Sequence, residues 1–143
     1  MIKADPIIVA ATAEQLRDCG VGRRECVTYW LARVQSDQVL AVRHPRHAAT
    51  ATGYEVDGAW LTDLFLELGT SRLRIAAQLH SHPGNWVGHS GIDDAFAVVE
   101  MPGLISIVVP RFAVDGISPS ACGIFVLTAG GGWLADRGAV RWT

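Results

Sequence analysis

Residues 79–94 have the sequence Leu-His-Ser-His-Pro-Gly-Asn-Trp-Val-Gly-His-Ser-Gly-Ile-Asp-Asp. The segment 73–82, which overlaps its start, is predicted to be a strand, and alternate side chains of a strand share one face of a sheet. His80 and His82 are therefore expected to point to the same side. Pro83 cannot continue a hydrogen-bonded ladder, so we expect the strand to end there and the chain to turn away.

The segment after this strand is predicted to bring a carboxylate back toward the two imidazoles. Residues 84–89 include two glycines that let the backbone double back, and Asp93 is then expected in the first turn of a helix. Two imidazoles and a carboxylate are ligands that zinc prefers, and three protein ligands leave a fourth tetrahedral position open for water. His80, His82 and Asp93 therefore predict a catalytic zinc site with one Zn²⁺ per chain.

The same residues also allow structural interpretations. Ser90 and Asp93 have the spacing of a helix N-cap, in which the serine caps the helix and the helix dipole favours the aspartate. A single histidine such as His80 is often a hydrogen-bonded core residue. Capping and metal ligation are compatible at a helix start, so the joint occurrence of all these residues favours the metal site.

Composition predicts one compact domain over residues 1–143, because 50% of the residues are hydrophobic and only 18% are charged. The formal net charge is −2, and the twelve lysines and arginines are scattered along the chain. We therefore expect no nucleic acid as a main partner. No apolar run reaches the ~20 residues that a membrane span requires, so we expect no membrane partner either.

The three cysteines, Cys19, Cys26 and Cys122, cannot all pair, and none lies in a C-x-x-C arrangement. The simplest interpretation is reduced thiols in a cytoplasmic protein. The N-terminal segment agrees with a cytoplasmic location, because the Asp5-Pro6 step interrupts the pattern of a secretory signal peptide.

Hydrophobic periodicity and turn residues predict an α/β fold, a mixed sheet with helices packed on it. The expected strands are residues 6–9, 26–34, 39–43, 50–56, 73–82, 104–109, 123–128 and 133–142. The expected helices begin at Thr12 and end at 19–22, cover 60–68 with Gly69 as a stop signal, and cover 92–100. Residues 44–47 are expected to be irregular.

At this point the sequence resembles a known family. The pattern His-x-His-Pro, six residues, Ser, two residues, Asp is the motif of the JAMM (MPN+, JAB-domain) zinc metalloproteases, and the matching residues are His80, His82, Pro83, Ser90 and Asp93. The order of expected elements over most of the chain is also similar to that family. The resemblance implies a mixed sheet sandwiched by helices, of cytidine-deaminase-like type, and zinc ligation by the two histidines and the aspartate.

The resemblance also implies two catalytic residues. Glu25 matches the family's glutamate at the start of the strand after the first helix, where it would accept a proton from the activated water and pass it to the leaving amine. Ser90 would hydrogen bond the oxyanion. The chain departs from the family pattern after Glu25, where Cys26-Val-Thr-Tyr-Trp replaces the usual glycines and leucine. The alternative for Glu25 is an exposed charge at a helix end.

Two residues of the loop at 84–89 are candidates for substrate binding. Trp86 is a large aromatic residue between the ligands, where it could contact substrate or anchor the loop by packing. His89 is expected in a loop facing the substrate, and it is also the one nearby candidate for a fourth ligand if the zinc were structural.

The resemblance implies cleavage of peptide or isopeptide bonds after the C-terminal glycine of ubiquitin or a ubiquitin-like protein. Small members of this kind resemble bacterial proteins encoded beside ubiquitin-like proteins and E1- and E2-like enzymes, including antiphage operons of the Bil type. The main hypothesis is therefore a deubiquitinase-like zinc isopeptidase, with residues 56–60 and 84–88 lining the groove for the substrate tail. The alternatives are a protease of a sulfur-carrier protein and a non-catalytic MPN-type scaffold.

Overall fold

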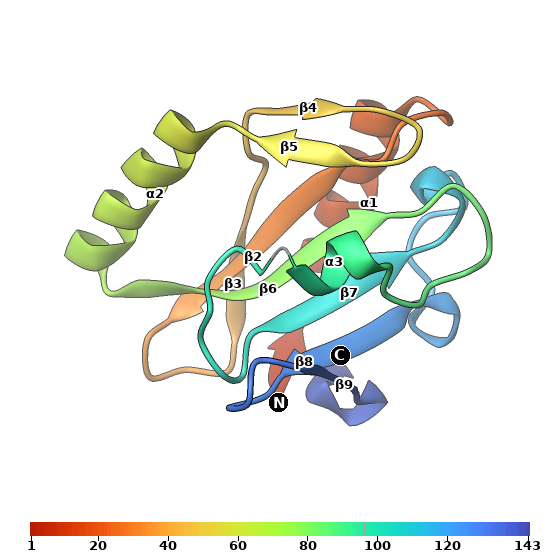
Figure 1. Ribbon diagram of the computed structural model, residues 1–143. Helices are drawn as coiled ribbons and strands as arrows, with labels where there is room; N and C mark the ends of the chain where they lie inside the picture. Colours follow the sequence, from red (N-terminus) through yellow and green to blue (C-terminus); the bar gives the residue numbers. More distant parts are fainter. Residues whose placement is uncertain (96) are drawn as a thin grey trace.

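A mixed six-stranded sheet forms the centre of the computed structural model, which describes residues 1–95 and 97–143 (Figure 1). The strand order is β3-β2-β6-β7-β8-β9, in which β6 and β7 are parallel and the other neighbours are antiparallel. The strands are β2 (Val27–Arg33), β3 (Val39–Arg43), β6 (Leu73–Ser81), β7 (Ile105–Val109), β8 (Gly123–Leu127) and β9 (Trp133–Ala135). The predicted mixed sheet is confirmed.

Helices cover the two faces of this sheet, as the strand β2 illustrates by its alternating side chains. Trp30 packs in the core beneath α1 (Pro6–Gly20), whereas Tyr29 and Leu31 pack in the core beneath α2 (Gly58–Ser71). The predicted α/β sandwich is confirmed. None of the described helices combines the length and the hydropathy that crossing a bilayer requires.

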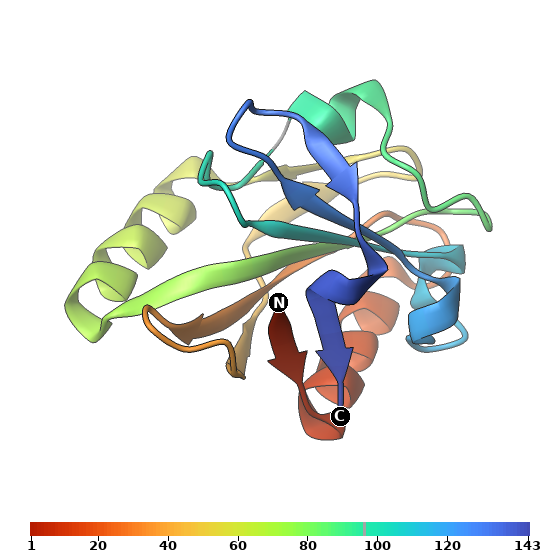
Figure 2. The same ribbon diagram turned by 90° about the horizontal axis from the view of Figure 1, so that it is seen from below.

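Two small sheets and four short helices complete the architecture. The strands β4 (His47–Ala49) and β5 (Tyr54–Val56) form an antiparallel pair. The strand β1 (Ile2–Ala4) pairs in parallel with β10 (Val140–Trp142), so that the first and last strands lie side by side (Figure 2). The short helices are α3 (Gly91–Ala95), η1 (Arg111–Ala113), η2 (Pro119–Ala121) and η3 (Arg137–Ala139).

The first helix begins earlier than predicted, so the expected strand at residues 6–9 is wrong. Asp5 is the N-cap, its carboxylate accepts a hydrogen bond from the Ile8 N–H at 2.9 Å, and Pro6 occupies the first turn. Proline fits there because the N–H that it lacks would have no helical partner. Thr12 lies inside the helix, where its hydroxyl donates to the Ile8 carbonyl at 2.7 Å and accepts from Trp30 Nε1 at 2.7 Å.

The other two helix predictions also need correction at their ends. Gly69 lies inside α2, which ends when Arg72 adopts a left-handed conformation with φ of 52°. The predicted helix at residues 92–100 is shorter, because α3 ends at Ala95 and residues 97–100 are not helical; residue 96 lies outside the described residues. The expected irregular segment 44–47 leads directly into β4.

The expectation that all three cysteines are reduced is wrong. Cys19 in the last turn of α1 and Cys26 just before β2 form a disulfide, with Cα atoms 6.2 Å apart, while Cys122 is free and buried. The two cysteines are seven residues apart, and the turn between α1 and β2 brings them together. The disulfide removes the thiol argument for a cytoplasmic location, which stays a prediction.

A close approach between β8 and the loop at residues 84–89 generates a stability prediction. A Cβ atom on Gly123 would overlap the Val87 carbonyl oxygen and would lie 3.0 Å from the Phe125 ring. Gly123→Ala is therefore expected to lower the free energy of unfolding by about 1–3 kcal/mol, the usual cost of overpacking. Urea denaturation measures this change.

The matched control is Gly132→Ala in the turn between β8 and β9. A Cβ atom there has Thr128 Oγ1 at 3.9 Å as its nearest neighbour, which is an ordinary contact. Gly132→Ala should therefore cost much less. Equal losses of stability in the two variants would contradict the tight contact between Gly123 and Val87.

Candidate metal centre and active site

Three side chains converge at the end of β6, as the sequence predicts. His80 Nε2 lies 3.1 Å from His82 Nε2, and the two Asp93 oxygens lie 3.3 Å from His80 Nε2 and 3.1 Å from His82 Nε2. One ligand atom from each residue lies within 4.8 Å of the others. His80 and His82 are only 1% and 5% exposed, so both imidazoles are held in a buried position.

Backbone pairing on both sides of β6 fixes the position of the two histidines. His80 lies opposite Val27 of β2 and opposite Val108 of β7. Beyond the last residue of the strand, the His82 N–H donates to the Val109 carbonyl at 2.8 Å, and the His82 carbonyl accepts from the Phe112 N–H at 2.8 Å. The ligand pair is thus anchored in the middle of the sheet.

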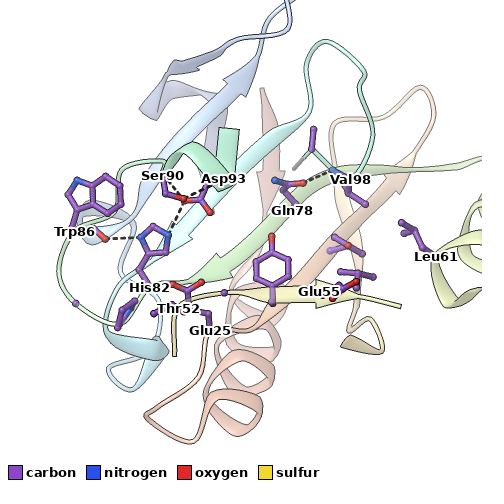
Figure 3. A pocket seen from close by; sticks show the side chains of 17 residues that line it. Glu25, Thr52, Glu55, Leu61, Gln78, His82, Trp86, Ser90, Asp93 and Val98 are labelled. Carbon is purple, nitrogen blue, oxygen red and sulfur yellow. Dashed lines mark hydrogen bonds and ion pairs between the residues drawn. The ribbon is translucent and has the colours of Figure 1, made fainter. Parts of the chain in front are cut away.

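His82 is oriented by the loop that follows it. Its Nδ1 donates to the Trp86 carbonyl at 3.0 Å, and its Nε2 faces Asp93 (Figure 3). Such a hydrogen bond on the far nitrogen is the usual support of a metal-binding histidine. The Trp86 indole also stacks on the imidazole, with ring centroids 5.4 Å apart, although the tryptophan is 61% exposed.

Asp93 both caps α3 and faces the histidines. Its N–H donates to Ser90 Oγ at 3.1 Å, and its Oδ2 accepts from the Ser90 N–H at 2.9 Å. Burial alone would raise the pKa of Asp93, but hydrogen bonds with His80 and His82 hold this pKa well below its ordinary value. Because capping and contact with the imidazoles coexist here, the two interpretations of the Ser90–Asp93 pair are compatible.

The donor set fits a zinc ion. Zinc would be held by His80 Nε2, His82 Nε2 and a carboxylate oxygen of Asp93, and the side toward the cavity would remain open, as in catalytic zinc sites. Two imidazole nitrogens facing each other at 3.1 Å share at most one proton, whereas a cation satisfies both lone pairs and the carboxylate together. The geometry therefore supports a metal ion at this position.

The His89 side chain lies against β7 and β8, and its two predicted roles stay predictions. Its ring packs on Phe125 with centroids 4.1 Å apart, and its two nitrogens lie 3.2 Å from Asp94 Oδ1 and 2.9 Å from Ser106 Oγ. It is not among the described residues that line the cavity, nor among those that converge with Asp93. The loop turns this side chain onto β7 and β8, where a buried polar ring finds partners.

Glu25 lies in the same cavity as His82 and Asp93 and is only 7% exposed. Its N–H donates to the Thr50 carbonyl at 2.7 Å, and β2 begins two residues later. Burial raises the pKa of the Glu25 carboxyl to about 7, against the opposing influence of His82. The alternative of an exposed charge at a helix end is therefore wrong, and a carboxyl with this pKa can exchange protons near neutral pH.

The cavity has a volume of about 680 Å³ and joins a polar end to an apolar interior. Glu25, His82, Ser90 and Asp93 mark the polar end, and Trp86 lies at its rim (Figure 3). The described residues that line the rest are Tyr29, Thr52, Gly53, Tyr54, Glu55, Val56, Leu61, Gln78, Pro83, Gly84, Ala97 and Val98.

The two segments predicted to line the substrate groove account for only part of the cavity lining. Of the predicted segments 56–60 and 84–88, Val56, Gly84 and Trp86 line the cavity. Tyr54 was missed, although its ring lies 5.8 Å from that of His80. Gln78 was also missed, although its place two residues before His80 puts both side chains on one face of β6.

The fold and the site together define a metalloprotease domain of JAMM/MPN type. The chain is 33% identical over 139 residues to a probable metalloprotease, y4jG, of Sinorhizobium fredii, covering 92% of this chain and 85% of that protein. No family model matches the chain. The chain belongs to the JAMM/MPN metalloprotease family.

Solved structures agree with this fold. A JAB1/MPN domain protein from Archaeoglobus fulgidus is similar with a TM-score of 0.58 and 10% identity, covering 99% of this chain and 97% of that one. A protein from Desulfitobacterium hafniense has a TM-score of 0.71 and 13% identity, covering 100% and 93%. A protein from Salinibacter ruber has a TM-score of 0.63 and 16% identity, covering 94% and 88%.

Removal of one ligand should empty the metal site. In protein with an intact Cys19–Cys26 disulfide, we expect about one bound zinc ion per chain. Asp93→Ala or His80→Ala should reduce this zinc to nearly none, because the remaining two ligands do not define a zinc site. Elemental analysis of the purified variants measures this. His89→Ala is the control and should keep its zinc, and unchanged zinc in both ligand variants would place the metal elsewhere.

Glu25→Gln should separate metal binding from catalysis. The amide keeps the size of the side chain but cannot accept the proton, so zinc content and thermal stability should remain while cleavage falls by at least about 100-fold. Retained turnover would remove Glu25 from the mechanism.

The pH dependence of the wild-type enzyme tests the same residue. Glu25 is a base only when ionised, so kcat/KM should fall as the pH drops through the raised pKa of about 7. The positive charge of bound zinc lowers this pKa, so the midpoint is expected at or below pH 7. An activity that rises on acidification would contradict the assignment.

Proposed function

We propose that this protein is a zinc-dependent isopeptidase or peptidase that cleaves after the C-terminal tail of a bacterial ubiquitin-like protein. The observation that carries the proposal is the buried Glu25 carboxyl in one cavity with His82 and Asp93, on which His80 also converges. Membership in a metalloprotease family supports hydrolysis of an amide bond.

The metal ligands, Glu25 and Ser90 have separate roles in the proposed hydrolysis. Zinc bound by the two histidines and the aspartate would supply Lewis acidity and lower the pKa of a water molecule to about 7. Glu25 then accepts the proton of the attacking water and delivers it to the leaving amine. Ser90 Oγ already accepts the Asp93 N–H, so its hydroxyl hydrogen is available to donate to the oxyanion at the polar end of the cavity.

An extended peptide suits the shape of the entrance. Among the described strands, β5 pairs with β4 alone, so its other edge is available, and residues 52–56 line the cavity. An extended tail that adds to this edge would be held by backbone hydrogen bonds, as peptide-binding sheets commonly do. Trp86 would cover the tail from the opposite side, which gives the tryptophan its predicted role in substrate binding.

The proposed partners are a ubiquitin-like protein and its conjugates, together with E1- and E2-like enzymes of the same operon. In this role the enzyme would trim precursors or remove the modifier in the cytoplasm, including in antiphage defence. A sulfur-carrier protein is the alternative substrate, because its tail would present the same extended backbone to β5. A non-catalytic scaffold is disfavoured, because it has no need of a buried base beside three metal-binding groups.

The test is cleavage of defined tails. A bacterial ubiquitin-like protein is joined through its last glycine to a reporter, once by a peptide bond and once through a lysine side chain, and a sulfur-carrier protein is fused to the same reporter. We expect cleavage directly after the glycine, located by mass spectrometry, and loss of cleavage with a zinc chelator and in Glu25→Gln. Zinc-loaded enzyme that cuts unrelated peptides but none of these tails would overturn the proposed substrate class.

A further inference from the structure

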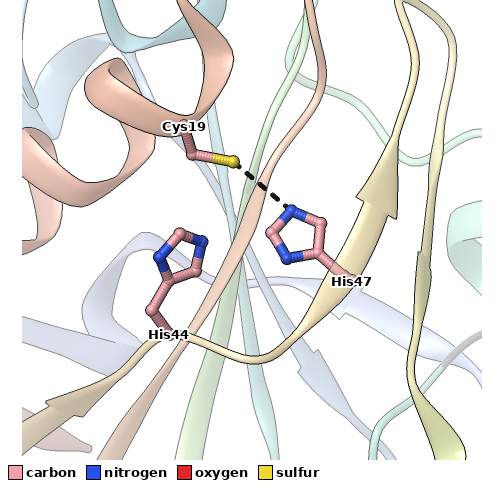
Figure 4. A group of neighbouring side chains, drawn as sticks. All are labelled: Cys19, His44 and His47. Carbon is pink, nitrogen blue, oxygen red and sulfur yellow. Dashed lines mark hydrogen bonds between the residues drawn. The ribbon is translucent and has the colours of Figure 1, made fainter.

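A second group of metal-binding side chain types lies outside the cavity. Cys19 comes from the last turn of α1, His44 follows β3, and His47 begins β4 (Figure 4). Cys19 Sγ lies 3.4 Å from His47 Nε2, and one donor atom from each of the three residues lies within 4.8 Å of the others. None of the three lines the catalytic cavity among the described residues.

His47 is oriented in the same way as His82. Its Nδ1 donates to the Pro45 carbonyl at 2.8 Å, so its Nε2 lone pair points toward Cys19 Sγ. The His44 ring lies beside it, with ring centroids 5.2 Å apart. A backbone carbonyl that fixes the tautomer of one histidine, with the free nitrogen facing a sulfur and a second imidazole, is the arrangement that metal sites use.

The disulfide decides whether this group can bind a metal. The thiolate is the form of cysteine that ligates metals, and Cys19 Sγ is bonded to Cys26 Sγ. We propose that Cys19, His44 and His47 form a second metal site, selective for a thiolate-binding divalent ion such as Zn²⁺, which becomes available when the Cys19–Cys26 disulfide is reduced.

Reduction of the Cys19–Cys26 disulfide requires an external reductant. A phosphine and one water break the S–S bond, giving a phosphine oxide and two protein thiols; a dithiol does the same and becomes a disulfide. Cys26 then stays a buried thiol, because it is fully enclosed in the core. Cys19, which is half-buried, loses its proton to solvent as its sulfur binds the metal, and the exposed position of His44 leaves room for water as a fourth ligand.

The disulfide and the proposed metal site would each cross-link the end of α1 to a segment close to Glu25, but the two segments differ. The disulfide ties the end of α1 to the start of β2, directly after Glu25. The metal would instead tie the end of α1 to residues 44–47. The Glu25 N–H donates to Thr50, three residues after His47, so the second cross-link would also border the catalytic base.

Cobalt provides a test that is independent of catalysis. Co²⁺ bound to a thiolate has a charge-transfer band in the near ultraviolet, and the His80–His82–Asp93 site contains no sulfur, so the band reports on the second site alone. Oxidised wild-type protein should bind one Co²⁺ without this band. After reduction with a phosphine it should bind a second Co²⁺ and acquire the band, which requires no substitution.

Variants assign the band to Cys19 and His47. Cys26→Ser frees Cys19 and should show the band without reductant, whereas Cys19→Ser should lack it although Cys26 and Cys122 remain. His47→Ala should weaken Co²⁺ binding at this site by more than the roughly 10- to 100-fold effect of losing an outer-shell partner. Asp93→Ala should keep the band while losing the other Co²⁺, which separates this inference from the proposed function.

Absence of the band in both reduced wild-type protein and Cys26→Ser would overturn the inference, since the first carries no substitution that could disturb folding. A band of unchanged affinity in His47→Ala would also overturn it, because another set of ligands would then hold the metal.

Discussion

The carboxylate of Asp93 is shared between two imidazoles and the start of a helix, and the active site depends on this sharing. One oxygen faces His80, and the other faces His82 while accepting the Ser90 N–H. A buried charge is costly unless every lone pair finds a partner. Here much of the compensation comes from the two histidines, 11 and 13 positions away in sequence. The loop between them must therefore return to the end of β6, and its contacts with Gly123 and His82 hold it there.

Enclosure in the cavity affects the reactivity of the site as well as its ability to bind a metal. The same enclosure that desolvates Glu25 and raises the pKa of its carboxyl also strengthens every electrostatic interaction at the polar end. The apolar interior, to which Tyr29 and Leu61 contribute, lies on the α2 side of the sheet. The sheet therefore separates two functions: the α1 side contributes packing, and the α2 side contributes a reactive surface.

The ligands could be predicted from the sequence because they lie within fourteen residues, and because strand periodicity and helix capping are local rules. What failed depended on contacts between distant segments. Tyr54 reaches the site through the β4–β5 pair, and the Cys19–Cys26 disulfide depends on how α1 meets β2. The unusual sequence after Glu25 also becomes understandable in three dimensions, because Tyr29 forms a cavity wall while Trp30 fills the opposite core. The start of α1 was misplaced although its signal, Asp5-Pro6, was local.

The parallel pairing of β1 with β10 has a topological consequence. Ile2 lies opposite Val140, and the Thr143 N–H donates to the Ala4 carbonyl, so the first and last residues are separated by little more than one short ladder. Both lie at the edge of the molecule away from β4 and β5 in Figure 1. A few added residues could join them into a closed ring, and new ends could then be opened in a surface turn without interrupting the central sheet. This geometry makes the domain a suitable scaffold for circular permutation or for insertion into a host protein.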